Sequence, residues 1–227
     1  MDIKKEPSVK NALSLCFSLA LALLVAGCPE PFSPGIDIPD DTGDLEENTD
    51  LFVEDGGDPG TFVFETNDSA YWSSSGYTLW ALDGVAQDTF VSRTVKVYKS
   101  SGNSWAGYGL VLCHYDTEDP AFGETMLVAM INNKREYIVG EVASGTFSAF
   151  FDWTISLSLN EGEGVPNTIG IVRIGEEFVL SFNGLEAYRF RDDETPLHTR
   201  GRDGFIVVIS PQDRFPQTPV KVNFIVQ

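Results

Sequence analysis

The sequence is poor in cysteine, and this shortage excludes a disulfide scaffold. Only three of the 227 residues are Cys, and two of them, Cys16 and Cys28, lie within the first 28 positions. Cys113 is the one thiol in the rest of the chain, so no intramolecular disulfide can form there. Residues 61–227 must therefore be held together by a hydrophobic core, and they are numerous enough to build one.

Positive charge is also scarce. Lys and Arg total 15 against 34 Asp and Glu, which gives a formal net charge of −19. Such a chain repels the phosphates of nucleic acids, so we expect no nucleic-acid partner.

Histidine is rarer still, and its placement argues against a metal centre. His114 follows Cys113 in a predicted strand, where adjacent side chains point to opposite faces, so the two cannot share a metal or act as nucleophile and base. The alternation places His114 with Tyr108, Leu110 and Leu112. The second histidine has no Cys or His near it in sequence, which disfavours zinc. No phosphate-binding loop, nucleophile elbow or dinucleotide fingerprint occurs.

The one long apolar run stands at the N-terminus. Three lysines precede an almost wholly apolar stretch, residues 11–26, which prolines then stop. A basic start, a run shorter than the ~20 residues of a membrane-spanning helix, and small residues at its end are typical of a secretory signal. We expect residues 1–27 to be this signal.

The end of that run, Val25-Ala26-Gly27-Cys28, resembles the lipobox of bacterial lipoproteins. The resemblance implies cleavage after Gly27 and a diacylglyceryl thioether on Cys28, usually with a further acyl chain such as palmitate. Two or three chains anchor a protein stably at a membrane, whereas one does not. Pro29 stands where an inner-membrane retention signal would have Asp, which favours the outer membrane in a Gram-negative cell. An ordinary signal peptide with an incidental cysteine is the alternative.

Residues 29–60 are rich in Pro and Gly and carry eleven acids with no Lys or Arg. Such a segment buries too little apolar surface to offset its ordering entropy, and its like charges extend it. We expect residues 28–60 to form a solvated tether behind the lipid. Four aspartates between positions 37 and 44 raise the alternative of a Ca²⁺ loop, but the EF-hand spacing is absent.

From residue 61 onward no stretch has helical periodicity, and short alternating or apolar runs recur between turn residues. These runs predict strands at 61–65, 77–82, 89–99, 107–115, 124–131, 135–143, 147–153, 168–174, 177–183, 186–191, 204–209 and 220–226. So many strands predict an all-β fold, an antiparallel β-sandwich or jelly roll of two stacked sheets. Asn132-Asn133-Lys134 and Asn183-Gly184 predict hairpin turns.

Four segments carry a family resemblance: GYGLVLCHYDTED, EYIVGEVASGTFSAFFDWT, NEGEGVPNTIGIVRIGEEFVLSFNG and GRDGFIVVIS. In this order they resemble the concanavalin A-like lectin/glucanase superfamily, especially its laminin-G-like and 3-keto-disaccharide-hydrolase-like bacterial domains. The resemblance covers about residues 100–210 and implies a concanavalin-like sandwich over 61–227. It indicates fold more than chemistry, because the motifs are turns and core. Residues 120–123 depart from the family's Asn-aromatic-Tyr loop, so no site is carried over from that loop.

The catalytic pattern of the glucanases in this superfamily is missing. Those enzymes carry Glu-x-Asp-x-x-Glu on one strand, and retaining hydrolysis needs two carboxyl groups ~5–5.5 Å apart. Neither Glu161-Gly-Glu163 nor Glu176-Glu177 reproduces the pattern, and both lie beside predicted turns. We therefore assign no catalytic residue.

Rings are the candidate ligand contacts, because sugars stack on flat aromatic faces while polar neighbours bond their hydroxyls. The candidates are Trp72, Trp105, His114 and Tyr137, with Trp105 preferred because its SGNSWAG loop looks least like a strand interior. Packing in the core or at its rim is the competing interpretation for each of them. Trp80 and Trp153 lie within apolar alternation and are expected in the core.

The sequence thus favours a lipid-anchored cell-envelope protein whose lectin-like module binds a glycan or a surface protein without catalysis. Its partners would be the membrane, through Cys28, and that ligand. We expect no cofactor; the alternative is Ca²⁺ at the acidic clusters 116–119 or 192–194, where surface solvation is the simpler explanation of both. The alternatives are a glycan-active hydrolase of the keto-disaccharide-hydrolase type and a structural envelope protein that mediates assembly.

Overall fold

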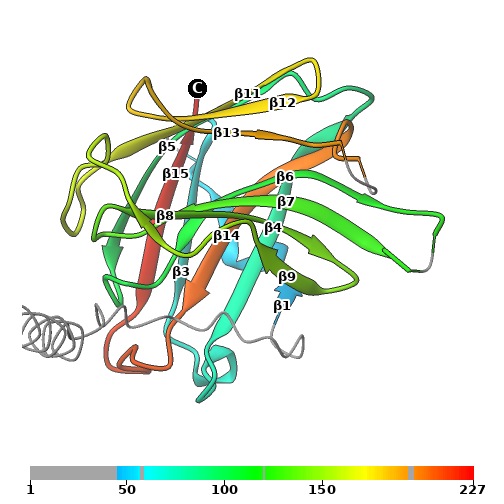
Figure 1. The fold of residues 1–227 in the computed structure, drawn as a ribbon. Helices are drawn as coiled ribbons and strands as arrows, with labels where there is room; N and C mark the ends of the chain where they lie inside the picture. The colour runs from blue at the N-terminus through cyan, green and yellow to red at the C-terminus, as the bar shows by residue number, and fades with distance from the viewer. Residues whose placement is uncertain (1–44, 57–58, 120, 194–196) are drawn as a thin grey trace, which may run out of the picture. The chain divides into compact units, whose positions relative to one another are not determined.

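Two β-sheets packed face to face make up the part of the chain that the computed structural model describes, residues 45–56, 59–119, 121–193 and 197–227 (Figure 1). The expected signal 1–27, Cys28 and the first part of the expected tether lie outside these residues. The helices within them are single 3₁₀ turns, η2 (Thr49–Leu51) and η3 (Ser69–Tyr71). No helix of the described ranges is long and apolar enough to cross a membrane.

Sheet A has its strands in the spatial order β1 (Leu45–Glu47), β4 (Tyr77–Gln87), β14 (Gly201–Ile209), β6 (Tyr108–Asp116), β7 (Glu124–Ile131) and β8 (Glu136–Ala143). Two short strands, β9 (Thr146–Ala149) and β10 (Thr154–Ile155), pair with the outer edge of β8. All these pairs are antiparallel except β1 with β4. The apolar β7 lies in the middle of this sheet, as its two-sided apolar pattern predicts.

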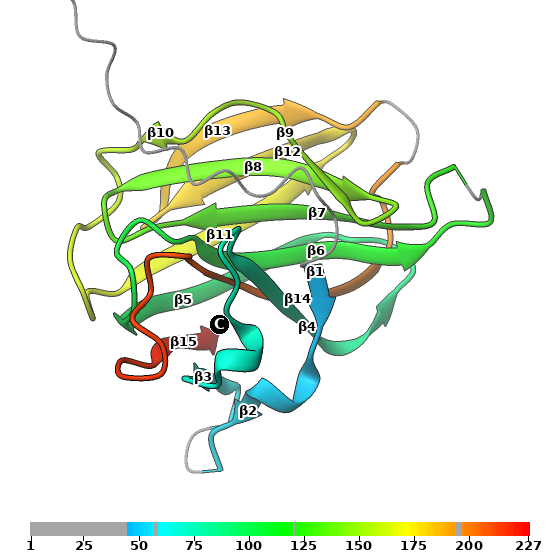
Figure 2. The same ribbon diagram turned by 90° about the horizontal axis from the view of Figure 1, so that it is seen from below.

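Sheet B has the order β13 (Leu185–Arg191), β12 (Glu177–Phe182), β11 (Asn167–Ile174), β5 (Ser92–Ser101), β15 (Val220–Val226), β3 (Thr61–Thr66) and β2 (Phe52–Glu54). Every neighbouring pair in it is antiparallel. Figure 2 shows the same strands from below. The predicted β-sandwich of jelly-roll type is confirmed.

Each stretch that sequence alternation predicts as a strand contains one. β7 and β15 have the predicted bounds, whereas the stretch 147–153 holds only β9 before the chain turns toward β10. The turn after β12 forms at Asn183 and Gly184, both with positive φ, as predicted. In the β7–β8 hairpin the residue with positive φ is Arg135 rather than an asparagine.

The predicted boundary between tether and domain at residue 60 is too late. Strands β1 and β2 lie within the expected tether, and β2 pairs with β3 at the edge of sheet B. Phe52 is buried, and its ring centroid is 4.9 Å from that of Phe64. The acidic residues around Phe52 are exposed. Because they dominate the composition of the segment, its composition does not indicate that Phe52 attaches it to the core.

The main core lies between the sheets and contains many rings. Phe205 of β14 and Phe224 of β15 join the two sheets, with ring centroids 4.5 Å apart. On β12 the predicted apolar face, Phe178, Leu180 and Phe182, is buried in the same cluster. Removing one such ring from a close-packed core costs about 3–5 kcal/mol, so this layer dominates the stability of the sandwich.

A β-bulge in β6 reverses the expected orientation of His114. The register of β6 against β7 shifts between Leu112 and Tyr115, and Cys113 has a φ of 55°. Cys113 therefore joins Leu112 in the core between the sheets. His114 lies on the outer face instead, with its ring 4.9 Å from that of Trp80. The expectation that His114 shares a face with Leu112 is wrong, because the extra residue of a bulge breaks the two-residue period.

A second apolar cluster, which includes Trp80, lies on the outer face of sheet A. Gly109 of β6 stands in this face between Ile206 of β14 and Met130 of β7. A Cβ atom at Gly109 would overlap the carbonyl oxygen of Ala129 and lie 2.9 Å from Met130 Cα. Only a residue without a side chain allows the strands to approach this closely.

Replacement of this glycine tests the close approach. We expect Gly109→Ala to lower the free energy of unfolding by about 3 kcal/mol, because the backbone of β7 must move to admit the methyl group. Gly56→Ala is the matched control, since a Cβ there has no atom within 4 Å. Urea unfolding measures both variants, and equal stability of the two would contradict the packing described for β6 and β7.

Candidate functional site

The first of two described pockets opens at one edge of the sandwich, where β8 and the segment after β9 face β13. This edge pocket has a volume of about 390 Å³ and is lined by Glu141, Phe150, Tyr188, Phe190, Arg191, Asp192 and Asp193. In Figure 1 its walls belong to the green β8–β9 region of sheet A and to the orange β13 of sheet B. The site thus exists only because the two sheets stack.

Aromatic rings form one wall of the edge pocket. Tyr188 and Phe190 are two residues apart on β13, so their side chains project from the same face. Their ring centroids are 5.8 Å apart and the ring planes are inclined by only 20°. Phe150, whose side chain is 41% exposed, adds a third ring 5.3 Å from Phe190. Phe190 is only 8% exposed, so solvent reaches this apolar wall at Phe150 and Tyr188.

Charged groups complete the lining. Alternate side chains of β8 point toward sheet B. Of these, Tyr137 and Val139 are buried in the core, and Glu141 comes next in the alternation, so its carboxylate lies at the edge of the core. Arg191 pairs with Glu176 and, at 3.1 Å, with Asp193. The edge pocket therefore combines rings with fixed charges in one concave site.

Asp192 is held in place by a buried histidine. Its carboxylate accepts a hydrogen bond of 2.7 Å from the backbone N–H of His198 and lies 3.3 Å from Nδ1 of the same residue. Nε2 of His198 lies 3.0 Å from the Thr125 hydroxyl, so both ring nitrogens have side-chain partners. His198 therefore positions one wall of the edge pocket and is not arranged as a metal ligand.

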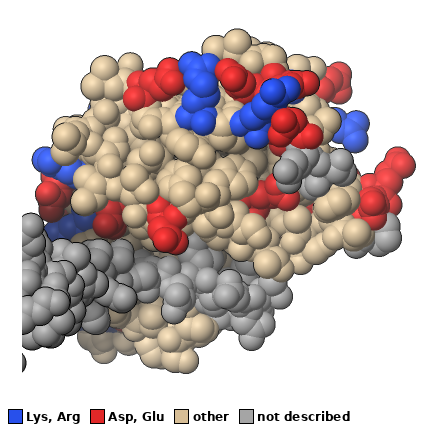
Figure 3. All heavy atoms as spheres, viewed as in Figure 1, with Lys and Arg blue, Asp and Glu red and all other residues tan. Residues whose placement is uncertain are grey.

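The surface beside the edge pocket is rich in ion pairs. Arg189 of β13 bridges to Glu177 at 2.9 Å and to Glu186 at 3.0 Å. The hydrogen bonds that Arg189 donates to Glu186, and then the one to Glu177, raise the pKa of its guanidinium. Figure 3 shows acidic and basic side chains gathered along the upper edge of the view, above a largely uncharged face. Exposed pairs of this kind contribute little stability but fix the local charge pattern.

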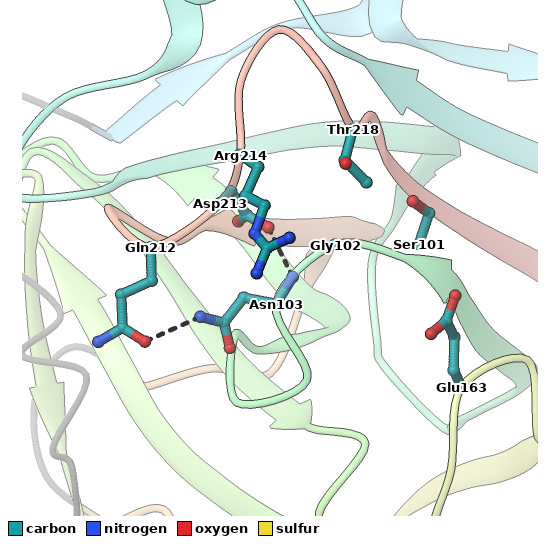
Figure 4. Close-up of a pocket in the computed structure, with 8 residues that line it drawn as sticks. All are labelled: Ser101, Gly102, Asn103, Glu163, Gln212, Asp213, Arg214 and Thr218. Carbon is teal, nitrogen blue, oxygen red and sulfur yellow. Dashed lines mark hydrogen bonds between the residues drawn. The ribbon is translucent and has the colours of Figure 1, made fainter.

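The second pocket is polar and lies at the end of the sandwich where three loops meet. It has a volume of about 340 Å³ and is lined by Ser101, Gly102, Asn103, Glu163, Gln212, Asp213, Arg214 and Thr218. Figure 4 shows Gln212 and Glu163 on opposite sides of it. Asp213 accepts backbone hydrogen bonds from Asn103 and Ser210, and the Asn103 amide donates to Gln212 at 3.1 Å. These hydrogen bonds fix the loops of the polar pocket, and no aromatic residue is among those that line it.

A buried lysine lies beneath the polar pocket. Lys99 is fully buried, and its ammonium donates to the Ala106 carbonyl oxygen at 3.4 Å. Burial lowers its pKa from the ordinary 10.5 to about 8, although the nearby Asp213 charge partly opposes that shift. A Cβ at Gly102 would lie 3.0 Å from Lys99 Cε, so the lysine supports the loop from behind. Lys99 faces the interior and not the pocket.

Three of the four ring residues predicted from the sequence are partly or largely buried, and none of the four lines either described pocket. Trp105 lies in the loop of the polar pocket, with Lys134 Nζ 5.9 Å from its ring centroid. Trp72, 40% exposed, follows η3. His114 Nε2 lies 2.6 Å from the Glu124 carboxylate. Trp72 and Trp105 stay predictions as ligand contacts.

Tyr137, the fourth predicted residue, is a core residue of β8. It is 6% exposed, and its ring meets those of Phe151 and Phe182 edge-on at 5.3 and 5.1 Å. Sequence analysis instead missed Phe150, Tyr188 and Glu141. Two features of the sequence could have indicated them. Tyr188 and Phe190 form a Tyr-x-Phe pair on one strand, and Glu141 is a carboxylate within the otherwise apolar alternation of β8.

Two chemically reactive groups lie away from both pockets. Burial raises the pKa of Asp203, which accepts hydrogen bonds from the Cys113 backbone N–H at 3.1 Å and from Gln87 at 3.2 Å. Burial also raises the pKa of the Cys113 thiol, with Asp203 adding to the shift, so little of the reactive thiolate forms. Both groups stabilise the bulge between β6 and β14.

The acidic clusters proposed for Ca²⁺ do not converge. Within the described ranges, no three side chains of His, Cys, Asp or Glu are grouped as a metal site would need. Asp119 instead accepts the Ala121 backbone N–H at 2.9 Å, which closes a turn. Residue 194 of the second cluster lies outside the described residues.

Comparison with known proteins identifies the fold. Neither a protein-family model nor a curated protein matches the sequence. Among solved structures, Bacillus licheniformis β-glucanase is 6% identical, with 81% of this chain and 83% of that chain covered and a TM-score of 0.55. A native glycosidic hydrolase is 10% identical, with 79% and 80% covered and a TM-score of 0.51.

Carbohydrate-binding module CBM66 from Bacillus subtilis is also similar, at 10% identity, 71% and 78% coverage and a TM-score of 0.45. At such low identities the likeness to solved structures shows the fold alone. The chain therefore shares the jelly-roll β-sandwich fold of the two structures with TM-scores of 0.55 and 0.51, which agrees with the fold that the sequence resemblance implies.

The buried lysine makes a prediction about pH. Its lowered pKa means that, between pH 8 and 10.5, the unfolded chain keeps a proton that the folded chain has lost, so stability rises with pH over this window. We expect the wild type to gain about 3 kcal/mol of unfolding free energy there relative to Lys99→Met. Lys96→Met, on the same strand with a half-exposed side chain, controls for loss of a lysine. Parallel profiles of wild type and Lys99→Met would contradict the assignment.

Proposed function

We propose that this chain is a glycan-binding module held at the bacterial cell envelope by lipid on Cys28. The observation that carries the glycan proposal is the edge pocket, where the rings of Phe150, Tyr188 and Phe190 face the charged groups of Glu141 and its neighbours. Sugar rings have one apolar face and a rim of hydroxyls, so a pocket of this composition matches both.

The dimensions and setting of the edge pocket support the proposal. Its volume of about 390 Å³ falls in the usual range of small-molecule sites, which combine a mostly apolar lining with a few oriented polar groups. Two of its rings stand on β13 and one in the segment after β9, and a core ring braces them, because Phe190 stacks on Phe178 at 5.2 Å. Such a wall loses little conformational freedom when a ligand binds.

The fold supports a glycan as the ligand class. Two structural neighbours with TM-scores above 0.5 are described as a β-glucanase and a glycosidic hydrolase, so this sandwich occurs in proteins that act on glycans. Function does not follow from fold alone, and the edge pocket supplies the second argument. We propose binding rather than hydrolysis because the sequence lacks the Glu-x-Asp-x-x-Glu strand that the glucanases of this superfamily carry.

Loss of one exposed ring tests the proposed site. We expect Phe150→Ala to weaken binding of a glycan, first identified on a glycan array, by about tenfold, because one stacking face is removed. Leu157→Ala, which removes another exposed apolar side chain (87% exposed) outside both pockets, should bind as the wild type does. Isothermal titration calorimetry measures both. Unchanged affinity of Phe150→Ala would move the ligand elsewhere, and an array with no hit would contradict glycan binding.

The anchor has its own test. The lipobox-like Val25-Ala26-Gly27-Cys28 supports the proposal of lipid on Cys28, with the outer membrane as destination in a Gram-negative cell. We expect Cys28→Ser, expressed in a bacterium, to leave the membrane fraction and to lose incorporation of labelled palmitate. Cys16→Ser is the matched control and should remain membrane-bound. Retention of unlabelled Cys28→Ser in the membrane would contradict lipid anchoring.

A further inference from the structure

We propose that the edge pocket selects glycans with free amino groups, with a protonated amine lying between its aromatic wall and the Glu141 carboxylate. The ligand class is then a cationic amino sugar, such as oligomers of unacetylated glucosamine. This inference rests on the proposed glycan-binding function and narrows it to one chemical class. Four features of the described residues support it.

The first feature is the balance of charge in the edge pocket. Three carboxylates line it, those of Glu141, Asp192 and Asp193, against the single guanidinium of Arg191. That guanidinium already pairs with Glu176 and Asp193, so its charge is compensated by residues of this chain. A ligand that enters the pocket therefore meets an excess of negative charge.

The second feature is the aromatic wall. The face of an aromatic ring carries partial negative charge and attracts a cation that lies within about 6 Å of its centre. Tyr188 and Phe150 are the two rings of this wall that solvent reaches, and the buried Phe190 packs against both of them from the core side, so a cation can contact more than one ring. Rings and carboxylates in the same pocket both favour an ammonium group, whereas a neutral hydroxyl gains only a hydrogen bond.

The third feature is the position of Glu141. It occupies an inward-facing place in β8, in the row that includes Val139, and its carboxylate is only partly exposed. Charge attraction is stronger at such a partly enclosed position than at an open surface, because less water screens it. Asp192 and Asp193 follow β13 on the same side of the pocket as Tyr188, whereas Glu141 stands on β8 of the other sheet, so Glu141 is the carboxylate that we assign to an amine lying between the two walls.

The fourth feature is the charge of the whole chain. A net charge of −19 attracts polycations at long range and repels anionic glycans such as uronic acids. This long-range attraction is weakened by salt, because the Debye length shortens as ionic strength rises. Selection for amino sugars should therefore decrease as salt is added, while stacking on the rings persists.

Three matched ligands test the proposal on the purified protein. These are β-1,4-linked hexamers of glucosamine, N-acetylglucosamine and glucose, which share one backbone and differ in the group at carbon 2. Calorimetry at a pH where the amine is protonated should give about tenfold tighter binding of the glucosamine hexamer than of the other two. Added salt should reduce that ratio.

Matched variants assign the effect to Glu141. Glu141→Gln should bring the affinity for the glucosamine hexamer down to that for the glucose hexamer and leave the latter unchanged. Glu163→Gln makes the same chemical change in the polar pocket and should have no effect. Thermal unfolding checks that each variant is folded. If Glu141→Gln does not fold, Asp193→Asn provides a second change of charge in the edge pocket.

The outcomes separate this inference from the proposed function. Equal affinities for the glucosamine and glucose hexamers would overturn amine selection and leave glycan binding standing. Loss of selectivity in Glu163→Gln instead of Glu141→Gln would overturn the assignment to the edge pocket. If none of the three hexamers binds but the array shows another glycan, the inference fails alone. If the array shows no glycan at all, both fail.

Discussion

Packing of sheet A against sheet B is the interaction on which the other features of this protein depend. The two sheets meet through a layer of rings, of which Phe205 and Phe224 form the closest contact across the layers. At one edge this layer is not covered, and there Tyr188 and Phe150 continue the aromatic row beyond the buried Phe190 into solvent. The edge pocket is thus the exposed end of the core, and the same packing that stabilises the fold orders its rings.

The strands could be predicted because alternation of apolar residues reports directly which side chains face the core. β7 and β15 have the predicted bounds for this reason. Local departures from the two-residue period escaped prediction. The bulge after Leu112 turns Cys113 inward and His114 outward, and nothing in the composition of β6 marks it. The short strand around Phe52 was missed because its acidic neighbours dominate the composition of the segment.

The candidate site could not be predicted from single residues, because similar residues have opposite surroundings. Tyr137 and Tyr188 both lie in alternating strands, yet Tyr137 belongs to an inner part of β8 and is buried, whereas Tyr188 lies on an edge strand and lines a pocket. Glu141 and Tyr188 come from different sheets and meet only through stacking. The family resemblance in the sequence favours the glycan-binding class, and the rings predicted there as ligand contacts, Trp72, Trp105, His114 and Tyr137, lie outside the edge pocket and stay predictions.

Glycan recognition at the edge pocket is the central claim, and a crystal structure of the protein soaked with a glycan selected on an array tests it most directly. The account predicts electron density for a sugar ring against Phe150, Tyr188 and Phe190, with one polar substituent at Glu141. Density for the sugar in the polar pocket beside Asn103, or on another surface with the edge pocket empty, would contradict the account.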